Sequence, residues 1–525
     1  MIALRRLPIL AAALAVVGVV LAPAGAVLLR AARNDSAVWS RLLDVRLAEL
    51  LGTTIGLAAG AALVAGVLGV AGAWLTTRWR FPGRGLAVAL LASPLAVPPY
   101  VTSLLWLETT TGEGPLAPWL DDVLFGRLAT GALLIGLCTS PLVFLVVRAA
   151  IARLDSTLED AAANLGHGPA TRIRTLVLPL LRPALVAGLC LVVLYALADF
   201  GAVSVLGLQT VTRAIFFEQL NPDRAAAWAG TAALATILLA VALPPFLAER
   251  AARGRARYAT ATGARRIRAV PRLGTGGQLL GWLLVLVVAG PTTLLVVGRA
   301  AWLVVGMEPG EALWGRAGAA LVSSAGLAAA AATLAVTGAL LVAWCGHRFG
   351  GLARWLAPLG SIGYVLPGPV VALGALLVVT AFAATRGALY GTMALLVLAY
   401  IVRFLPEALQ AADSGVGQAG PELEEAARML GAGPVGAVAR VTLPIVRSSL
   451  LAGWVLVFAA SLRELPATLL LKPAGLRTLP LEIWSFAEDS YYAPMAPFVL
   501  VLVAFGLPIV ALVVARGRDA AAGSA

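Results

Sequence analysis

Apolar runs of about 20 residues, separated by short polar segments, recur from one end of the chain to the other. A helix of that length crosses the hydrocarbon of a bilayer. The runs lack the alternating pattern of barrel strands, and open sheet edges are not stable in lipid, so we expect helices. The predicted spans are residues 7–29, 51–75, 85–106, 128–147, 183–206, 225–247, 279–297, 319–344, 355–382, 389–408, 450–470 and 494–514.

The spans divide into two halves of six, with a basic linker between them. We predict a first half at residues 1–248, the linker at 249–274 and a second half at 275–525. Because six is even, both halves have the same orientation in the membrane, and the repeat is parallel rather than inverted. The first run also has features of a cleaved secretion signal, but its length favours a retained span.

Two predicted spans, one in each half, carry prolines near the middle. Proline removes a backbone donor and bends a helix, and the freed carbonyls then need partners from protein or water. Helices bent beside a central pathway and simple packing kinks are both consistent with this pattern. The prolines are Pro94, Pro98 and Pro99 in the first half, and Pro358, Pro367 and Pro369 in the second.

Composition excludes a soluble protein. The chain is 60% hydrophobic and 12% charged, whereas a soluble protein of this size needs a far larger charged surface. Its net charge of +13 comes mostly from short loops beside the spans and from the linker. Such loops face the cytoplasm by the positive-inside rule, which also places both termini there. This placement indicates that the basic residues set the membrane topology and contact lipid head groups, and it does not favour nucleic-acid binding.

The soft-metal ligands are few. The chain has three cysteines, two histidines and five methionines. Cys138, Cys190 and Cys345 fall within spans or at a span end, so no disulfide framework is predicted. We predict no resident metal site and no cofactor bound by this chain.

One polar segment occurs twice. The first copy reads Leu-Glu-Asp-Ala-Ala-Ala-Asn-Leu-Gly-His-Gly-Pro from residue 158, and the second reads Leu-Glu-Glu-Ala-Ala-Arg-Met-Leu-Gly-Ala-Gly-Pro from residue 423. A Leu-Pro pair follows each copy, at Pro179 and Pro444. A single offset relates them, as from Gly166 to Gly431, and no gap is needed from Glu159 and Glu424 onward.

These two segments resemble the cytoplasmic "EAA" loop of ABC-importer permease subunits. The resemblance implies an all-α membrane protein of the type I importer (MetI-like) class, with loops at 155–182 and 420–447 that dock on a homodimeric ATP-binding subunit. It assigns the docking surface to Glu159, Asp160, Ala161 and Gly166, and to Glu424, Glu425, Ala426 and Gly431. Asp160 departs from the family pattern, which usually has Glu at that position.

Local physics supports the same segment as a helical hairpin. Alanines with carboxylates in the first turn favour a helix, Gly166 can adopt the left-handed conformation that ends it, and Pro169 suits the first position of another helix. A glycine that can end a helix and a proline that can begin the next recur at Gly431 and Pro434. A capped surface helix is the alternative for one copy, but two copies favour docking.

Two carboxylates lie within predicted spans. Asp199 and Glu464 occupy equivalent positions in the fifth span of each half, and Arg463 adjoins Glu464. Charges in a bilayer usually face a cavity or a partner, so we expect these three residues to line the translocation path. Carboxylate oxygens suit a hard cation such as Fe³⁺, and transient contacts with the metal are an open interpretation. A structural role in bonding neighbouring helices is the other.

The fused two-half plan, with Asp-Phe-Gly-Ala-Val from residue 199 and Leu-Arg-Glu-Leu-Pro-Ala from residue 462, is similar to the ferric-iron importer permeases. We expect iron(III) import from an extracytoplasmic binding protein across the bacterial inner membrane. Thiamine permeases share the plan, and sulfate, polyamine and phosphonate permeases share the loop, so these substrates remain alternatives. A secondary transporter and a membrane scaffold are less consistent with doubled docking loops.

No nucleotide-binding motif occurs in this sequence. The only lysine is Lys472, and no G-x-x-x-x-G-K-[ST] segment is present. The chain is therefore predicted to be a transport subunit and not an enzyme, with ATP hydrolysed by its partner.

Overall fold

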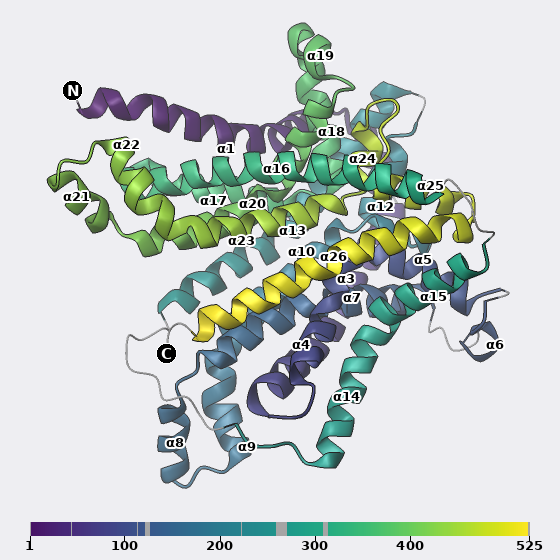
Figure 1. The fold of residues 1–525 in the computed structure, drawn as a ribbon. Helices are drawn as coiled ribbons and strands as arrows, with labels where there is room; N and C mark the ends of the chain where they lie inside the picture. The colour runs from purple at the N-terminus through teal and green to yellow at the C-terminus, as the bar shows by residue number, and fades with distance from the viewer. Residues whose placement is uncertain are drawn as a thin grey trace. The chain divides into compact units, whose positions relative to one another are not determined.

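The computed structural model describes the chain except residues 1, 44, 113, 121–125, 222, 259–269, 308–312 and 523–525. Helices of very different lengths make up nearly all of the described part, and no strand occurs in it (Figure 1). The chain forms two compact units, which are described separately below. The arginine-rich middle of the predicted linker, with Arg265, Arg266 and Arg268, lies outside the described residues.

The first unit comprises residues 1–44, 214–239 and 311–489. In it the long helix α16 packs along α20 and α23, and α1 packs on α16, α17 and α18. Its α-helices are α1 (Ile2–Ala32), α2 (Ser36–Leu43), α16 (Leu313–Phe349), α17 (Leu356–Gly360), α18 (Gly368–Ala381), α19 (Ala383–Leu389), α20 (Met393–Ala419), α21 (Pro421–Met429), α22 (Pro434–Ala437), α23 (Leu443–Leu462), α24 (Pro466–Leu471) and α25 (Leu479–Glu488). Tighter or wider turns form η4 (Gly351–Trp355), η5 (Ser361–Val365) and η6 (Val438–Thr442).

The second unit comprises residues 45–213, 240–310 and 490–525. Here α3 packs along α7 and α10, while α14, α15 and α26 pack beside α4 and α5. Its α-helices are α3 (Val45–Arg78), α4 (Arg84–Ala92), α5 (Pro99–Thr110), α6 (Ala117–Leu120), α7 (Arg127–Ala152), α8 (Ser156–Asn164), α9 (Pro169–Arg172), α10 (Leu178–Ala198), α11 (Gly201–Val205), α14 (Thr275–Ala289), α15 (Leu295–Val305) and α26 (Tyr492–Ala522). Short segments are η1 (Ser93–Ala96), η2 (Ile173–Val177) and η3 (Gly290–Leu294), and α12 (Val211–Glu218) and α13 (Arg224–Tyr258) contribute to both units.

Each unit includes helices that come from the other half of the sequence. The first helix of the chain, α1, belongs to the unit built from the later spans, and so does the first part of α13, which accepts hydrogen bonds from Arg30 and Asn34 at the end of α1. Conversely, α14, α15 and the last helix α26 belong to the unit built from the earlier spans. Each unit therefore contains helices from the beginning and from the end of the other sequence half.

Each predicted membrane span overlaps a candidate in the structure. Ten helices of the described part are long and apolar enough to cross a membrane, and the number is 12 if each of two pairs of bent helices forms one span. The predicted bounds are wrong at 183–206 and 450–470, whose candidates end at residues 198 and 462. The fold class is therefore that of an all-α integral membrane protein.

The two proline-bearing spans are broken, not gently bent. The segments 84–96 and 99–110 meet at 95°, and the segments 351–365 and 368–381 meet at 113°. At each break the chain becomes extended, at Val97 and Pro98 in one unit and at Leu366 and Pro367 in the other. A residue before proline is disfavoured in the helical region, which explains why both helices stop there.

Candidate functional site: helical hairpins and buried acids

The first repeated segment folds as a hairpin of α8 and α9. Asp155 caps the start of α8, and its carboxylate accepts the backbone N–H of Thr157 at 3.0 Å. It ends in a Schellman motif, in which Gly166 donates to the carbonyl of Ala163 and His167 to that of Ala162. Both carbonyls at the helix end are thereby satisfied without a side chain.

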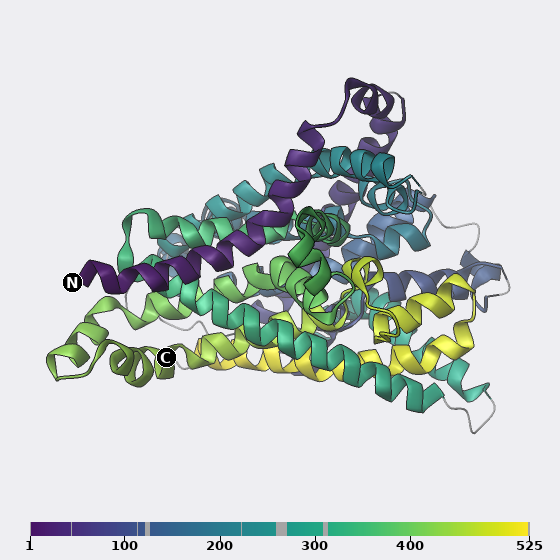
Figure 2. The ribbon, with the colours of Figure 1, turned by 90° about the horizontal axis from the view of Figure 1, so that it is seen from above.

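The second repeated segment forms the same hairpin from α21 and α22. Pro421 opens the helix, and Gly431 and Ala432 donate to the carbonyls of Arg428 and Ala427 at its end. In Figure 1 this hairpin stands at one end of its unit, beyond the ends of α20 and α23, with α24 and α25 at the opposite end. Figure 2, the view from above, shows the start of α1 at the same end as this hairpin.

The predicted turns are confirmed in both hairpins. Gly166 and Gly431 have φ of 81° and 89°, in the left-handed region that L side chains rarely adopt. Pro169 opens α9, as the sequence predicts. A wider π turn then follows in each copy, η2 and η6, at the same offset, which the sequence pattern did not indicate.

The hairpin tips present apolar side chains to the surroundings. Leu165 is 78% exposed, its counterpart Leu430 is 90% exposed, and the neighbouring Met429 is 89% exposed. The predicted docking residues Asp160, Ala161, Gly166, Glu425, Ala426 and Gly431 are also exposed. The hairpin tips therefore combine exposed apolar side chains with exposed carboxylates.

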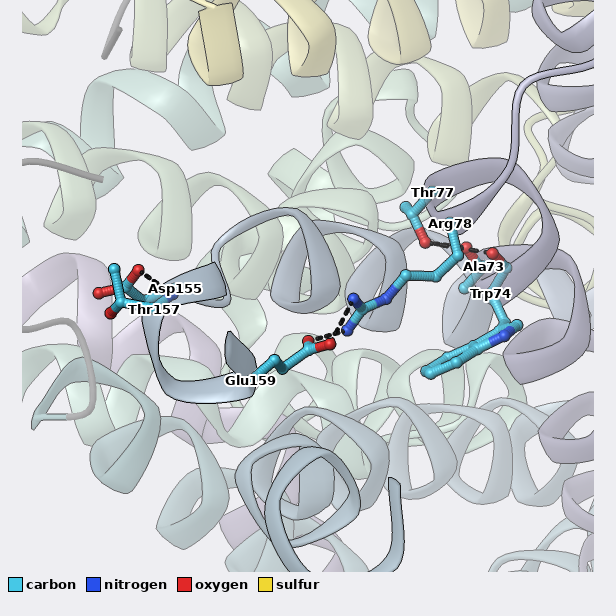
Figure 3. Close-up of polar contacts among 7 residues, drawn as sticks. All are labelled: Ala73, Trp74, Thr77, Arg78, Asp155, Thr157 and Glu159. Carbon is cyan, nitrogen blue, oxygen red and sulfur yellow. Dashed lines mark hydrogen bonds and ion pairs between the residues drawn. The ribbon is translucent and has the colours of Figure 1, made fainter. Parts of the chain in front are cut away.

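Glu159 and Glu424, the other two acids of the predicted docking surface, point inward and anchor the hairpins. Glu159 is buried, and both of its oxygens accept from the Arg78 guanidinium, at 3.0 and 2.5 Å (Figure 3). Arg78 is the last residue of α3, and its guanidinium also lies over the Trp74 ring at 4.9 Å. This two-pronged arrangement fixes the direction of α8 relative to α3.

Glu424 anchors the second hairpin with more partners. Arg348 at the end of α16 lies 2.6 Å from one Glu424 oxygen, and Trp344 and Thr442 donate to the same oxygen. Burial raises the pKa of the Glu424 carboxyl, but the Thr442 hydroxyl and the Arg348 guanidinium outweigh it and hold this pKa below its usual value. Only 2% of the Glu424 side chain is exposed, so the carboxylate depends on these partners.

Both glutamates are predicted from the sequence to lie on the docking surface, but in the structure they are buried against two arginines that the sequence pattern did not identify. A recurring Arg-Phe pair, Arg80-Phe81 and Arg348-Phe349, was the available signal. That signal leads to Arg348 in one half but to the wrong arginine in the other, because Arg78, not Arg80, pairs with Glu159.

The two predicted path acids lie at helix ends rather than inside helices. The sequence predicted continuous spans at 183–206 and 450–470, but α10 ends at Ala198 and α23 at Leu462. Asp199 accepts the N–H groups of Ala202 and Val203, at 2.9 and 3.3 Å, and so caps the short helix α11. A carboxylate that competes for backbone donors in this way favours a new helix start over continuation.

Glu464 caps its short helix similarly and also forms an ion pair. One of its oxygens accepts from Ala467 N at 3.2 Å, and the other lies 3.0 Å from Arg403 Nε. The neighbouring Arg463 is half-buried at the end of α23. The position equivalent to Arg403 in the first half is Cys138, whose thiol contacts Thr102, so the first half has no arginine at that position.

Each acid segment packs against the broken span of its own unit. A Cβ atom on Gly201 would meet Tyr100 Cβ at 2.6 Å, and one on Gly368 would meet a Glu464 carboxylate oxygen at 2.8 Å. Glycine is therefore required at both crossings. Within the described residues, no group of three His, Cys, Asp or Glu is placed to hold a metal ion.

Comparison with known proteins matches the chain twice to one family model, "Binding-protein-dependent transport system inner membrane component", at residues 66–254 and 335–518. The chain is 30% identical to the Fe(3+)-transport system permease protein FbpB 2 of Haemophilus influenzae over 481 residues, covering 89% of this chain and 90% of that protein. It is 24% identical over 480 residues to the ferric transport system permease protein FbpB of Actinobacillus pleuropneumoniae, covering 85% and 68%. One part is 32% identical over 213 residues to the sulfate transport system permease protein CysW of Escherichia coli, covering 39% and 72%.

Proposed function

Because the chain belongs to the binding-protein-dependent transport system inner membrane components, the permease subunits of ABC importers, we propose that it carries iron(III) into the cell. Members of this family are transport components and not enzymes, and they work with an ATP-binding subunit and an extracytoplasmic binding protein. The iron assignment is supported by the relative at 30% identity, which matches almost the full length of both chains.

The hairpins α8–α9 and α21–α22 are the proposed docking sites for the ATP-binding subunit, which we take to be a homodimer with one site for each hairpin. Three features support this role: the matched Schellman turns, the exposed apolar tips at Leu165 and Leu430, and the carboxylates of Asp160 and Glu425 beside them. Both hairpins and both chain termini then face the cytoplasm. The apolar tips supply contact area and the exposed acids supply orientation.

The buried ion pairs would transmit movement from these hairpins. A hairpin displaced by closure of the ATP-binding subunits would pull α3 through Arg78 and α16 through Arg348, because each arginine holds a buried glutamate of the hairpin. Both helices are long candidate membrane spans. Rigid links of this kind convert a local displacement into the tilt of a helix.

Asp199, Arg463 and Glu464 are the proposed path residues, with carboxylate oxygens offering transient contacts to a hard cation. Their places beside the two broken spans support this role, since extended backbone at membrane depth is tolerated only within protein or beside water.

The division of the sequence into two halves, with the first ending at residue 248 and the second beginning at residue 275, remains our prediction.

The test is transport by the complex reconstituted in liposomes with its ATP-binding subunit and binding protein. We expect uptake of radioactive iron(III) that requires ATP and is not reduced by excess sulfate or thiamine. Sulfate is the second candidate, because sulfate permeases match one half of the chain. Sulfate uptake without iron uptake would replace the iron assignment, and uptake without ATP would overturn the importer role.

A further inference from the structure

An apolar groove of about 860 Å³ runs between α3, α10 and α14. Its walls include Leu63, Val67 and Trp74 of α3, Leu189 of α10 and Leu280 of α14. Leu63, Val67 and Leu280 are 70%, 61% and 68% exposed, so the groove is open along its side. These helices are candidate membrane spans, and the open side therefore faces hydrocarbon.

Trp79 and Leu273, which line the groove, are the sequence neighbours of two arginines, Arg80 and Arg272. Where α3 stops, Arg80 N donates to the Pro271 carbonyl and Leu273 N donates to the Arg80 carbonyl, both at 2.9 Å. This bridge holds the backbone of Arg80 beside that of Arg272. Both arginines are exposed, and no acidic side chain of the described residues pairs with either.

Aromatic side chains fix this end of the groove. Trp74 and Trp79 line it, and tryptophan concentrates at the level of lipid head groups. Phe81 packs edge-on against Trp282 of α14, with ring centroids 6.3 Å apart. The loop after α3 and the start of α14 are thus held together, which keeps the arginines at the mouth of the groove.

Size and charge together favour one kind of occupant. The part of α3 that lines the groove, residues 62–75, rises about 20 Å, more than the depth of one leaflet of about 15 Å. A lipid tail is thin enough to lie in such a groove, and a phosphate head group matches two guanidinium groups that have no acidic partner among the described residues.

We propose that the groove binds one anionic phospholipid, with a tail between α3, α10 and α14 and the phosphate at Arg80 and Arg272. The lipid lies in the leaflet that faces the ATP-binding subunit, and this choice of leaflet rests on the proposed function. The lipid would fill the space beside α3, the helix whose last residue, Arg78, anchors the first hairpin.

The experiment is native mass spectrometry of the purified full-length chain, offered equal amounts of phosphatidylglycerol and phosphatidylcholine. We expect one phosphatidylglycerol to stay bound, and the double variant Arg80→Gln plus Arg272→Gln to retain it on the order of tenfold less. Val67→Trp, which fills the groove at an exposed position, should lower retention with both arginines intact. Arg440→Gln plus Arg447→Gln, which removes two exposed arginines of the other unit, is the matched control.

Equal retention of both lipids by the wild type, or equal loss in the arginine variant and its control, would overturn the proposal. A protein segment cross-linked in the groove instead of lipid would do the same. The measurement needs neither ATP nor the partner subunits, so its failure is separate from a failure of the transport assay.

Discussion

Arg348 and Glu424 form a buried ion pair at 2.6 Å that joins the end of α16 to the hairpin α21–α22. Arg78 and Glu159 do the same for α3 and the hairpin α8–α9. Each pair links a candidate membrane span to the segment that we propose to dock on the ATP-binding subunit. The links make the hairpins extensions of these helices rather than independent loops.

Removing the arginine should loosen the hairpin. Arg348→Ala leaves the Glu424 carboxylate buried without its counter-ion, and we expect a local loss of about 3 kcal/mol in the stability of α21. Hydrogen exchange of α21 measures the effect. Adding Glu424→Gln to Arg348→Ala should recover part of the loss, and Arg428→Ala, at an exposed position of α21, should change little. Additive effects of the two changes would contradict the ion pair's role.

The stability of the hairpin α21–α22 should fall as the pH is lowered. The pKa of Glu424 is lower in the folded chain than in the unfolded chain, whose usual value is about 4.3. Its contribution to stability is therefore fully present above that usual value and is lost as pH falls through the lower folded pKa. Hydrogen exchange of α21 should rise over this range, whereas Glu424→Gln should flatten the response. An identical profile in the variant would exclude Glu424 as the cause.

The apolar tips should govern affinity for the ATP-binding subunit. Leu165→Asp and Leu430→Asp each place a charge in the proposed contact, and we expect about tenfold weaker binding or more. Stability should not change, because both leucines are exposed. Leu352→Asp, at a position 88% exposed outside the hairpins, is the control. Binding of purified ATP-binding subunit measures the effect, and undiminished binding by both tip variants would remove the docking assignment.

The turn glycines should be sensitive to backbone conformation alone. A Cβ atom on Gly431 meets nothing within 4 Å, so the cost of Gly431→Ala comes from its φ of 89°. We expect about 1 kcal/mol of hairpin stability to be lost, less for Gly431→Asn, because asparagine tolerates this region better. Transport-coupled ATP hydrolysis should also fall more in Gly431→Ala than in Gly431→Asn. A smaller effect for alanine than for asparagine would argue against this explanation.

Loss of the charge on Glu464 should lower the stability of the chain. Glu464→Gln leaves Arg403 without its counter-ion and should cost about 3 kcal/mol of stability. Adding Arg403→Gln to Glu464→Gln should restore stability but not iron uptake. Normal uptake in that double variant and in Asp199→Asn would leave both acids with a structural role only.

Local features of this protein could be predicted from sequence, because they depend on neighbouring residues. Gly166 and Pro169 determine the first hairpin turn without distant contacts, and the pairs at Val97-Pro98 and Leu366-Pro367 break their helices in the same way. Apolar length likewise predicts the membrane spans.

Features that depend on packing between distant segments could not be predicted. The sequence gives no reason to prefer Arg78 over Arg80 as the partner of Glu159, since the choice depends on where α3 ends relative to α8. Capping by Asp199 is decided by the competition between side-chain and backbone acceptors, so the predicted span continued too far. The exchange of α1 between sequence halves leaves no local signal at all.

The exchange of α1 also constrains how the chain is made. The ribosome produces α1 well before α16, α17 and α18, against which it packs. At about 5–20 residues per second, the interval is on the order of half a minute. During that time α1 must remain in the bilayer without these three partners, held largely by its own affinity for lipid. Its long apolar sequence, of which only a small part is buried even after assembly, suits that wait.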